Sequence, residues 1–291
     1  MRSRQPGRGG RVVRGVDSYK PQVLLGGLSE EGFCIAWDPF TAGRLVAGDN
    51  AGTLAGWVVD ALVNKPLPDV VFDGPTIDVQ GEGKGNAVNS LQFSPITPDA
   101  LVAGFDSGHL AVYDVRKPPM PSKTIDTGSC VNVCRFSPFD ATIVATGHPD
   151  GVVNVWDLSK PASPLHTLTH HSGDVFHLEW SPHNQGVLAT GADDSRVLVW
   201  DLSGDHASAS ASVSGSGKDE MPPELWFVHA GHTDVISGLS WSPSCPMLIA
   251  SCAEDNSLQL WAPASQQVDG EDMWPPTKSQ SQGLRVLEDS D

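Results

Sequence analysis

Five hydrophobic segments of the chain end in the same pattern, in which an aromatic residue is followed two positions later by proline. These aromatic residues are Trp37, Phe93, Phe136, Trp180 and Trp241. A second aromatic residue lies 20 positions further along in every unit, namely Trp57, Tyr113, Trp156, Trp200 and Trp261. Five equal spacings indicate an internal structural repeat.

Each unit predicts a set of short antiparallel strands. The first strand ends near the aromatic-x-proline corner, because proline cannot donate a hydrogen bond in a central ladder. Segments of small residues follow as second strands, at 44–47, 101–103, 143–146, 187–190 and 248–251. A Gly/Asp turn leads to a third strand that ends at the second aromatic residue, and a fourth, outer strand lies between units, for example at 165–168 and 225–228. Four such strands form one blade of a β-propeller, so the chain is predicted to be all-β.

The spacing between units predicts the domain organisation. Successive corner aromatic residues are 56, 43, 44 and 61 positions apart, and two of these distances match a repeat of about 40–45 residues. The units are expected at 20–60, 76–116, 121–159, 163–203 and 225–263, with loop insertions at 61–86 and 204–223. Residues 1–19 are predicted to be a basic disordered arm and residues 264–291 an acidic disordered tail.

The repeats over residues 20–263 resemble the WD40 family. Two units carry its full signature, in the order His171, Asp194, Trp200 and His232, Asp255, Trp261. The resemblance implies that these residues form buried hydrogen-bond networks that brace each blade. The third unit has Asp150 in the bracing position but no corresponding histidine. Since the family usually closes with seven blades, we expect five recognisable blades that correspond to the C-terminal part of such a propeller, with a five-bladed ring as the alternative.

The last units are similar to one branch of that family, the histone-binding WD proteins related to the retinoblastoma-binding proteins and the small subunit of chromatin assembly factor 1. The resemblance rests on the SPHN corner at 181–184, the PPEL run at 222–225 and the EDN turn at 254–256. It implies a non-enzymatic scaffold without a cofactor, which binds core histones and other basic tails within chromatin assembly, deacetylase or remodelling complexes. The implied location is the nucleus, with the cytoplasm as a further possibility.

The resemblance also implies two binding surfaces. One is an acidic propeller face for histone tails, to which we assign Glu31, Phe33, Asn89, Asp106, Asn132, Asp174, Phe176, Asp193 and Glu254. Carboxylates there would pair with Arg or Lys, while the phenylalanines would contact the aliphatic stems of those side chains. Asn89 and Cys130 occupy positions where acids are expected in this family, which weakens the predicted affinity.

The second surface is a proline loop that would contact a basic amphipathic helix. It comprises Asp219, Glu220, Met221, Pro222, Pro223, Glu224, Leu225 and Phe227. Family members complete this groove with a long helix before the first blade. The opening segment MRSRQPGRGGRVVRG is too rich in glycine to hold such a helix, so this site is expected to be weak.

Charge supports a basic protein partner. The chain has 35 acidic and 18 basic residues, giving a net charge of −17, and the segment 1–20 contributes +5 to that total. The rest of the chain therefore carries −22, which repels nucleic acid and favours encounters with cationic proteins. The five cysteines form no CxxC pair, so neither a disulfide framework nor a zinc site is predicted. No apolar run approaches the ~18 residues of a membrane span.

Several alternatives stay open at this stage. The final unit also resembles ribosome-assembly WD proteins of the glutamate-rich WD repeat type. Asp114 and Arg116 in the YDVR segment resemble the box by which some WD proteins dock on a cullin-4 ubiquitin ligase adaptor, although an ordinary strand end explains the segment as well. The face acids Asp106, Asp193 and Glu254 could be solvated turn residues.

Catalytic and metal-site interpretations are weaker. The histidines of one blade suggest a metal site but lack ligand spacing; they are His166, His170, His171, His177 and His183. The glycine-rich segments 81–85 and 215–219 lack the context of a phosphate loop. No nucleophile–base grouping has a recognisable signature, so we predict no enzyme.

Overall fold

The described residues form 19 short β-strands and no helix. The computed structural model describes residues 24–32, 34–59, 69–72, 86–203 and 221–263. The first two sheets contain β1 (Cys34–Trp37), β2 (Arg44–Gly48), β3 (Leu54–Val58), β4 (Val70–Phe72), β5 (Val88–Phe93), β6 (Ala100–Phe105), β7 (His109–Asp114) and β8 (Lys123–Asp126). The next two contain β9 (Val133–Phe136), β10 (Ile143–Gly147), β11 (Val152–Asp157), β12 (His166–Thr169), β13 (Val175–Trp180), β14 (Val187–Ala192), β15 (Val197–Asp201) and β16 (Leu225–His229). The last sheet contains β17 (Ile236–Trp241), β18 (Ile249–Ala253) and β19 (Leu258–Trp261).

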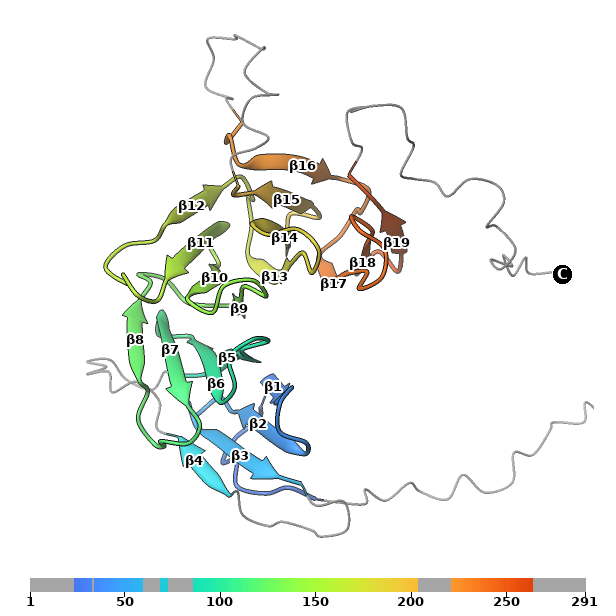
Figure 1. Cartoon of the computed structure of the whole chain (residues 1–291). Helices are drawn as coiled ribbons and strands as arrows, with labels where there is room; N and C mark the ends of the chain where they lie inside the picture. The colour runs from blue at the N-terminus through green and yellow to red at the C-terminus, as the bar shows by residue number, and fades with distance from the viewer. Residues whose placement is uncertain (1–23, 33, 60–68, 73–85, 204–220, 264–291) are drawn as a thin grey trace, which may run out of the picture.

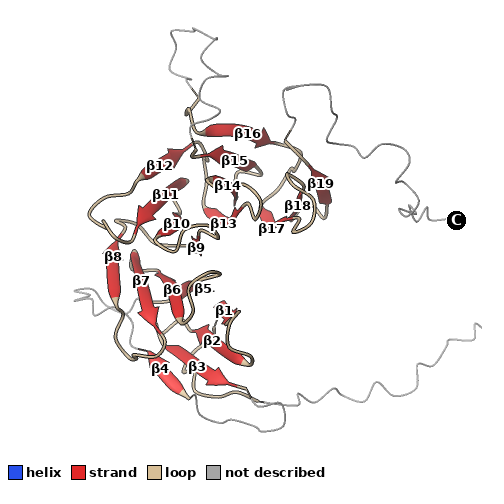
Figure 2. Cartoon of the chain, in the orientation of Figure 1, coloured by secondary structure: helices blue, strands red, loops and turns tan. Residues whose placement is uncertain are grey.

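Within each sheet the strands pair in chain order, and every pair is antiparallel (Figure 2). We call these sheets blades 1 to 5. The register repeats in blades 1 to 4: the corner aromatic at the end of the first strand lies beside the second residue of the next strand, as in the pairs Phe93–Leu101 and Trp180–Leu188. The predicted second strands all overlap the observed ones.

The five blades are arranged around an open arc (Figure 1). Their first strands lie on the inside of the arc, and β1 packs against β5, β5 against β9, β9 against β13, and β13 against β17. No contact of similar extent joins β17 to β1 among the described residues. The predicted all-β propeller architecture with five blades is confirmed.

A recurring pattern of hydrogen bonds forms the corner between the first and second strands. The residue between the aromatic and the proline accepts, through its side chain, backbone N–H groups two or three positions ahead, as Asp38 does from Phe40 and Thr41 at 2.8 and 3.2 Å. The corresponding residues of the other blades are Ser94, Ser137, Ser181 and Ser242. Short polar side chains favour such turns because they replace a backbone acceptor. The repeat therefore encodes the turn as well as the strand that precedes it.

The hydrophobic core lies between neighbouring blades. One cluster joins Val155 of β11 to Trp180 and Leu188 of blade 4, and another joins Val46 of β2 to Phe93 of blade 2. Small residues in the second strands allow this close approach. A Cβ atom added at Gly147 would lie 2.8 Å from Val175 of the next blade, too close for any side chain.

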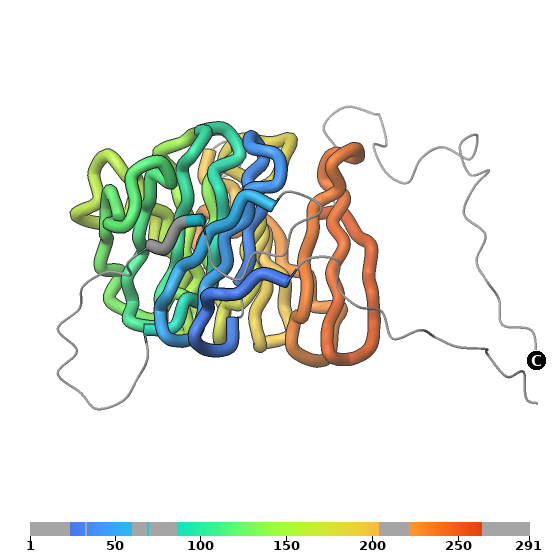
Figure 3. Tube along the Cα trace, turned by 90° about the horizontal axis from the view of Figure 1, so that it is seen from below, coloured from blue at the N-terminus to red at the C-terminus, as the bar shows by residue number. Residues whose placement is uncertain are grey.

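The strands run between two edges of the arc, as the edge-on view shows (Figure 3). Because the strands alternate in direction, turns between second and third strands and the connections between blades lie on one edge, which we call the upper edge. Turns between first and second strands, and between third and fourth strands, lie on the opposite, lower edge. The predicted arm, tail and Ser/Gly part of the second insertion lie outside the described residues.

Candidate functional site

The predicted acidic face draws its residues from upper-edge loops. Asp106, Asp193 and Glu254 each directly follow the second strand of their blade, and all three are exposed. A backbone hydrogen bond ties each of them to the incoming connection: Asp106 N–H donates to Ala87 O at 2.9 Å, Asp193 to Asp174 at 3.0 Å and Glu254 to Val235 at 2.9 Å. The same contact joins Asn50 N–H to the carbonyl of exposed Glu31 at 2.9 Å. The repeat thus presents an acid at the same point of several blades.

The acids of blades 3 and 4 influence one another. Burial raises the pKa of Asp174 above its ordinary value, and the negative charges of Asp193 and Asp150 raise it further. Among the described residues, the two charged groups that shift the pKa of Asp174 are therefore both carboxylates. A bound cationic side chain would relieve the repulsion, which is the electrostatic condition for a Lys or Arg subsite.

A polar cluster connects blades 2 and 3 on the same edge. The Cys130 thiol is 3.3 Å from Asp106 Oδ1 and 3.4 Å from Asn132 Oδ1, and Asn89 donates to the thiol sulfur at 3.4 Å and to Val131 O at 3.2 Å. Burial, followed by the hydrogen bond and charge of Asp106, raises the pKa of Cys130 to about 12. The thiol therefore stays neutral, and it engages one oxygen of Asp106.

Two phenylalanines were predicted to contribute to this face. Phe176 is 43% exposed, so its ring is accessible to the aliphatic part of a ligand. Phe33 lies outside the described residues.

The proline loop begins in the described part of the chain at Met221, which is 55% exposed. Pro223 is also exposed, and Pro222 and Glu224 are half-buried. Leu225 is only 8% exposed and joins the core of blades 3 and 4, and Phe227 stacks on Trp261 with ring centroids 5.6 Å apart. Both residues belong to β16, where Leu225 is buried and Phe227 is half-buried, and their predicted contact with a helix stays a prediction. Asp219 and Glu220 lie outside the described residues.

The signature residues of blades 4 and 5 form the same hydrogen-bond chain twice. In blade 4, His171 Nδ1 is 3.0 Å from Asp194 Oδ2, His171 Nε2 is 2.8 Å from Thr190 Oγ1, and Trp200 Nε1 donates to Thr190 Oγ1 at 2.9 Å. Burial opposes ionisation of Asp194, but hydrogen bonds from His171 and from backbone N–H groups hold its pKa below the ordinary value. This carboxyl is engaged within the blade.

Blade 5 repeats the arrangement with serine in place of threonine. His232 bonds Asp255 at 3.2 Å and Ser251 at 2.8 Å, and Trp261 donates to Ser251 at 3.0 Å. Hydrogen bonds from Ser257 and from the Thr233 N–H hold the pKa of Asp255 well below its usual range. Both networks connect the turn after the second strand to the connection that enters the blade.

Blade 3 uses a histidine that the sequence interpretation missed. His148 Nδ1 donates to Cys130 O at 2.9 Å, its Nε2 is 2.9 Å from Thr146 Oγ1, and Trp156 donates to Thr146 at 3.0 Å. Asp150, expected to brace this blade, is exposed, and its carboxylate accepts a hydrogen bond from Val152 N–H at 3.3 Å. His148, not Asp150, therefore braces blade 3, and Asp150 lies exposed on the upper edge, where its charge acts on Asp174.

Blade 1 uses the same position for an acid. Asp49 is fully buried and accepts hydrogen bonds from Ser29 N–H and Oγ, Glu30 N–H, Ala51 N–H and Thr53 N–H, at 2.8–3.4 Å. Asp49 and His148 both lie eight positions before the closing aromatic, where blades 4 and 5 have alanine. Neither blade 1 nor blade 3 has the histidine signature, and each has a polar residue at this position. That combination is the sequence signal that could have identified Asp49 and His148 as bracing residues.

The YDVR segment is locked by an internal ion pair. Arg116 Nε and Nη2 donate to the two oxygens of Asp114 at 2.8 and 2.9 Å, and Asp99 Oδ2 is 3.6 Å from Arg116 Nε. The hydrogen bonds from Arg116 hold the pKa of Asp114 well below its usual range. The Arg116 side chain is 64% exposed, so the pair lies at the surface of the blade.

The described residues lack the features of two other kinds of site. They contain no group of three or more His, Cys, Asp or Glu side chains placed to hold a metal ion. Nor does this part of the chain include a helix long and apolar enough to cross a bilayer.

Comparison with known proteins adds to this geometry. The profile of the WD domain, G-beta repeat, matches residues 120–157, 162–201 and 224–262. The chain is 42% identical over 255 residues to the probable histone-binding protein rba-1 of Caenorhabditis elegans, an alignment that covers 87% of this chain and 60% of the relative. It is 49% identical over 55 residues to histone acetyltransferase type B subunit 2 of Gibberella zeae, covering 19% of this chain and 13% of that protein. A similar match, 49% over 53 residues, is found with the subunit of the same name in Encephalitozoon cuniculi, covering 18% and 14%.

Proposed function

Because the chain belongs to the histone-binding WD40 repeat family, we propose that it is a scaffold, not an enzyme, and that it binds basic histone segments through its upper edge. It spans 60% of the length of the rba-1 protein. Within this proposal it serves as a subunit of nuclear chromatin complexes, which bring histones to partner proteins.

The proposal is carried by the carboxylates of blades 3 and 4. Asp174, Asp193 and Asp150 come from separate loops, and the charges of the last two add to the effect of burial in raising the pKa of Asp174. A histone tail supplies closely spaced Lys and Arg side chains, which neutralise such a group and donate hydrogen bonds to its oxygens. Phe176 offers an exposed ring for the aliphatic stems of those side chains.

The net charge of −17 supports the same class of ligand. It favours encounter with cationic proteins and disfavours direct binding of nucleic acid. In this proposal the exposed part of the proline loop, from Met221 to Glu224, provides a second contact on the lower edge. That contact is the weaker one, because Leu225 is buried in the core between blades 3 and 4.

The test is a fluorescence anisotropy titration with an Arg/Lys-rich histone-tail peptide. We expect Asp174→Lys combined with Glu254→Lys to weaken binding by roughly tenfold or more, since each change replaces attraction with repulsion. Affinity for the wild-type chain should also fall as salt is raised.

The matched control compares two single changes, Asp174→Lys on the upper edge and Asp157→Lys on the lower edge, which alter the charge equally. Asp157→Lys should leave binding of the peptide within about threefold of wild type, because only screened, long-range attraction is lost. Equal weakening by the two single variants would show that net charge, not the upper edge, drives binding.

A further inference from the structure

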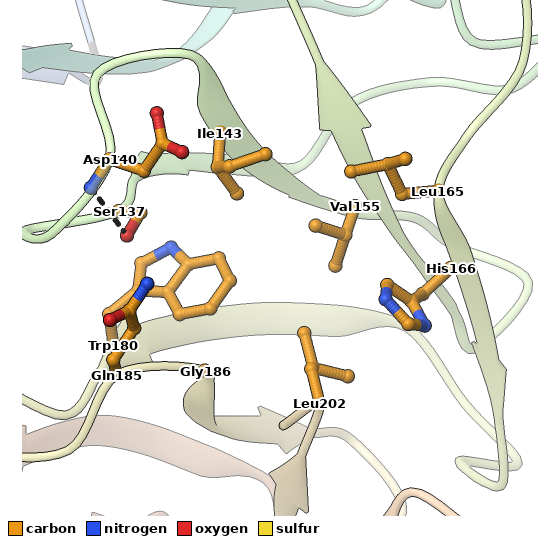
Figure 4. A pocket seen from close by; sticks show the side chains of 10 residues that line it. All are labelled: Ser137, Asp140, Ile143, Val155, Leu165, His166, Trp180, Gln185, Gly186 and Leu202. Carbon is orange, nitrogen blue, oxygen red and sulfur yellow. Dashed lines mark hydrogen bonds between the residues drawn. The ribbon is translucent and has the colours of Figure 1, made fainter. Parts of the chain in front are cut away.

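A pocket lies between blades 3 and 4 (Figure 4). It is formed at the lower edge, whereas the proposed histone-tail face is on the upper edge. Its apolar walls are Ile143 and Val155 from blade 3, Trp180 and Leu202 from blade 4, and Leu165 just before β12. The pocket has a volume of about 140 Å³. We call it the lower-edge pocket.

The floor of the lower-edge pocket is buried and its rim is accessible. Val155 and Trp180 are 1% and 6% exposed, and both belong to the core between the two blades. The Trp180 indole N–H is fixed by a hydrogen bond of 3.2 Å to Arg135 O. Leu165, at the rim, is 51% exposed. An apolar cavity of about 150 Å³ accommodates a benzene-sized group, so one aliphatic side chain fits here.

The polar groups around the rim are acidic or neutral. Asp140 lies on the exposed corner between β9 and β10, and its Oδ1 accepts hydrogen bonds of 2.8 Å from both the N–H and the hydroxyl of Thr142. Figure 4 shows Asp140 and His166 at opposite ends of the pocket. His166 Nδ1 is in turn 3.9 Å from Glu224 Oε1. None of the described residues that line the pocket is Lys or Arg.

We propose that the lower-edge pocket binds a linear segment of a partner protein that inserts one leucine-sized side chain and places a neighbouring Lys or Arg beside Asp140. The apolar walls supply the affinity through burial of the inserted side chain. The carboxylate of Asp140, held in orientation by Thr142, selects the cationic neighbour. Because the pocket and the upper-edge acids lie on opposite edges, the chain can hold this segment and a histone tail at once. The proposal does not depend on histone binding.

The experiment uses the full chain and three capped dipeptides: acetyl-Leu-Arg-amide, acetyl-Leu-Glu-amide and acetyl-Ala-Arg-amide. Binding is followed by NMR through the indole N–H signal of Trp180, assigned among the nine tryptophans by substitution. We expect saturable shifts with acetyl-Leu-Arg-amide. Binding of acetyl-Ala-Arg-amide should be roughly tenfold weaker, because the pocket loses its apolar ligand. Binding of acetyl-Leu-Glu-amide should be about threefold weaker, because the charge pair is exposed to water.

Two variants and one control locate the site. Leu165→Arg gives the half-exposed rim the same charge as the peptide and should abolish the shifts, while Ile96→Arg, an exposed aliphatic on the corner of blade 2, should leave them unchanged. Asp140→Asn keeps an acceptor for Thr142 and should make the Arg and Glu peptides bind equally. The proposal is overturned if Trp180 does not respond, if Leu165→Arg behaves like Ile96→Arg, or if acetyl-Leu-Glu-amide binds as well as acetyl-Leu-Arg-amide to the wild-type chain. Thermal unfolding of each variant confirms that it is folded.

Discussion

Blades 1 and 4 share one repeat but are stabilised differently. In blade 4 the corner residue Trp180 is 6% exposed and bonds the carbonyl of Arg135 in the preceding blade. In blade 1 the corresponding residue, Trp37, is 60% exposed, and its neighbour Ile35 is 63% exposed. The same residue type at the same position contributes to the core only where a neighbouring sheet covers it, as expected when repeats are stabilised by their interfaces.

The bracing of each blade, in contrast, is local. Blade 4 connects its upper-edge loops through His171, Asp194 and Thr190, and blade 1 connects them through Asp49 alone. A blade can therefore change its bracing residues without changing its fold. Interfaces between blades depend on burial instead, since the corner aromatics of blades 2 to 5 are only 2–6% exposed.

The largest effect should come from the corner tryptophans. Trp180→Ala removes a buried side chain and should lower the free energy of unfolding by about 3–5 kcal/mol. Trp37→Ala should lower it by less than about 1 kcal/mol, because most of that side chain already contacts water. Urea denaturation of the two variants measures both values. Equal losses would contradict the interpretation that neighbouring blades provide the burial.

A smaller loss is expected from Asp49→Ala in blade 1. The substitution leaves four backbone N–H groups, those of Ser29, Glu30, Ala51 and Thr53, without their shared buried acceptor, which should cost about 2–3 kcal/mol. Asp49→Asn retains one acceptor oxygen and should recover part of this loss. Denaturation curves for the pair of variants provide the measurement. If Asp49→Ala lowered the free energy of unfolding by no more than the loss of one exposed hydrogen bond does, water would be replacing the carboxylate as the acceptor.

The smallest effect concerns pH and blade 3. Burial lowers the pKa of His148 below its ordinary value, despite an opposing hydrogen bond to Cys130 O. The unfolded chain, in which a histidine titrates near pH ~6.5, therefore binds a proton that the folded chain excludes, and stability falls as pH drops below that value. Relative to His148→Gln, the wild-type chain should lose up to about 1 kcal/mol more between pH ~7 and pH ~5.5. If the free energy of unfolding changed with pH in the same way for both proteins, His148 would not be the group that causes the loss of stability at acid pH.

The sequence predicts the repeat well because its signals are local. The aromatic-x-proline corners and the closing aromatic residues determine where strands begin and end, and Trp57, Trp156 and Trp200 are buried as strand-end residues should be. Sequence reasoning missed Asp49 and His148 because both stand outside the signature positions, at a point of the repeat where the units with the full signature have Ala192 and Ala253. It did not foresee that β16 follows the two prolines almost directly, which buries Leu225 and leaves Phe227 half-buried.

The candidate binding face is only partly predictable for a related reason. Equal spacing places Asp106, Asp193 and Glu254 at the same point of their blades, which the sequence indicates directly. The interaction of Asp150 with Asp174 depends on the relative position of two blades and on the transfer of bracing to His148. No local pattern in the sequence encodes it.

The central claim is that the upper-edge carboxylates of blades 3 and 4 bind the cationic side chains of a histone tail. The most direct test is an NMR titration of the Asp174 carboxyl carbon, with and without a saturating Arg/Lys-rich histone-tail peptide. A bound cation favours the ionised carboxylate, so the raised pKa of Asp174 should fall toward or below its ordinary value in the complex. An unchanged pKa of Asp174 at full occupancy of the peptide would contradict the account.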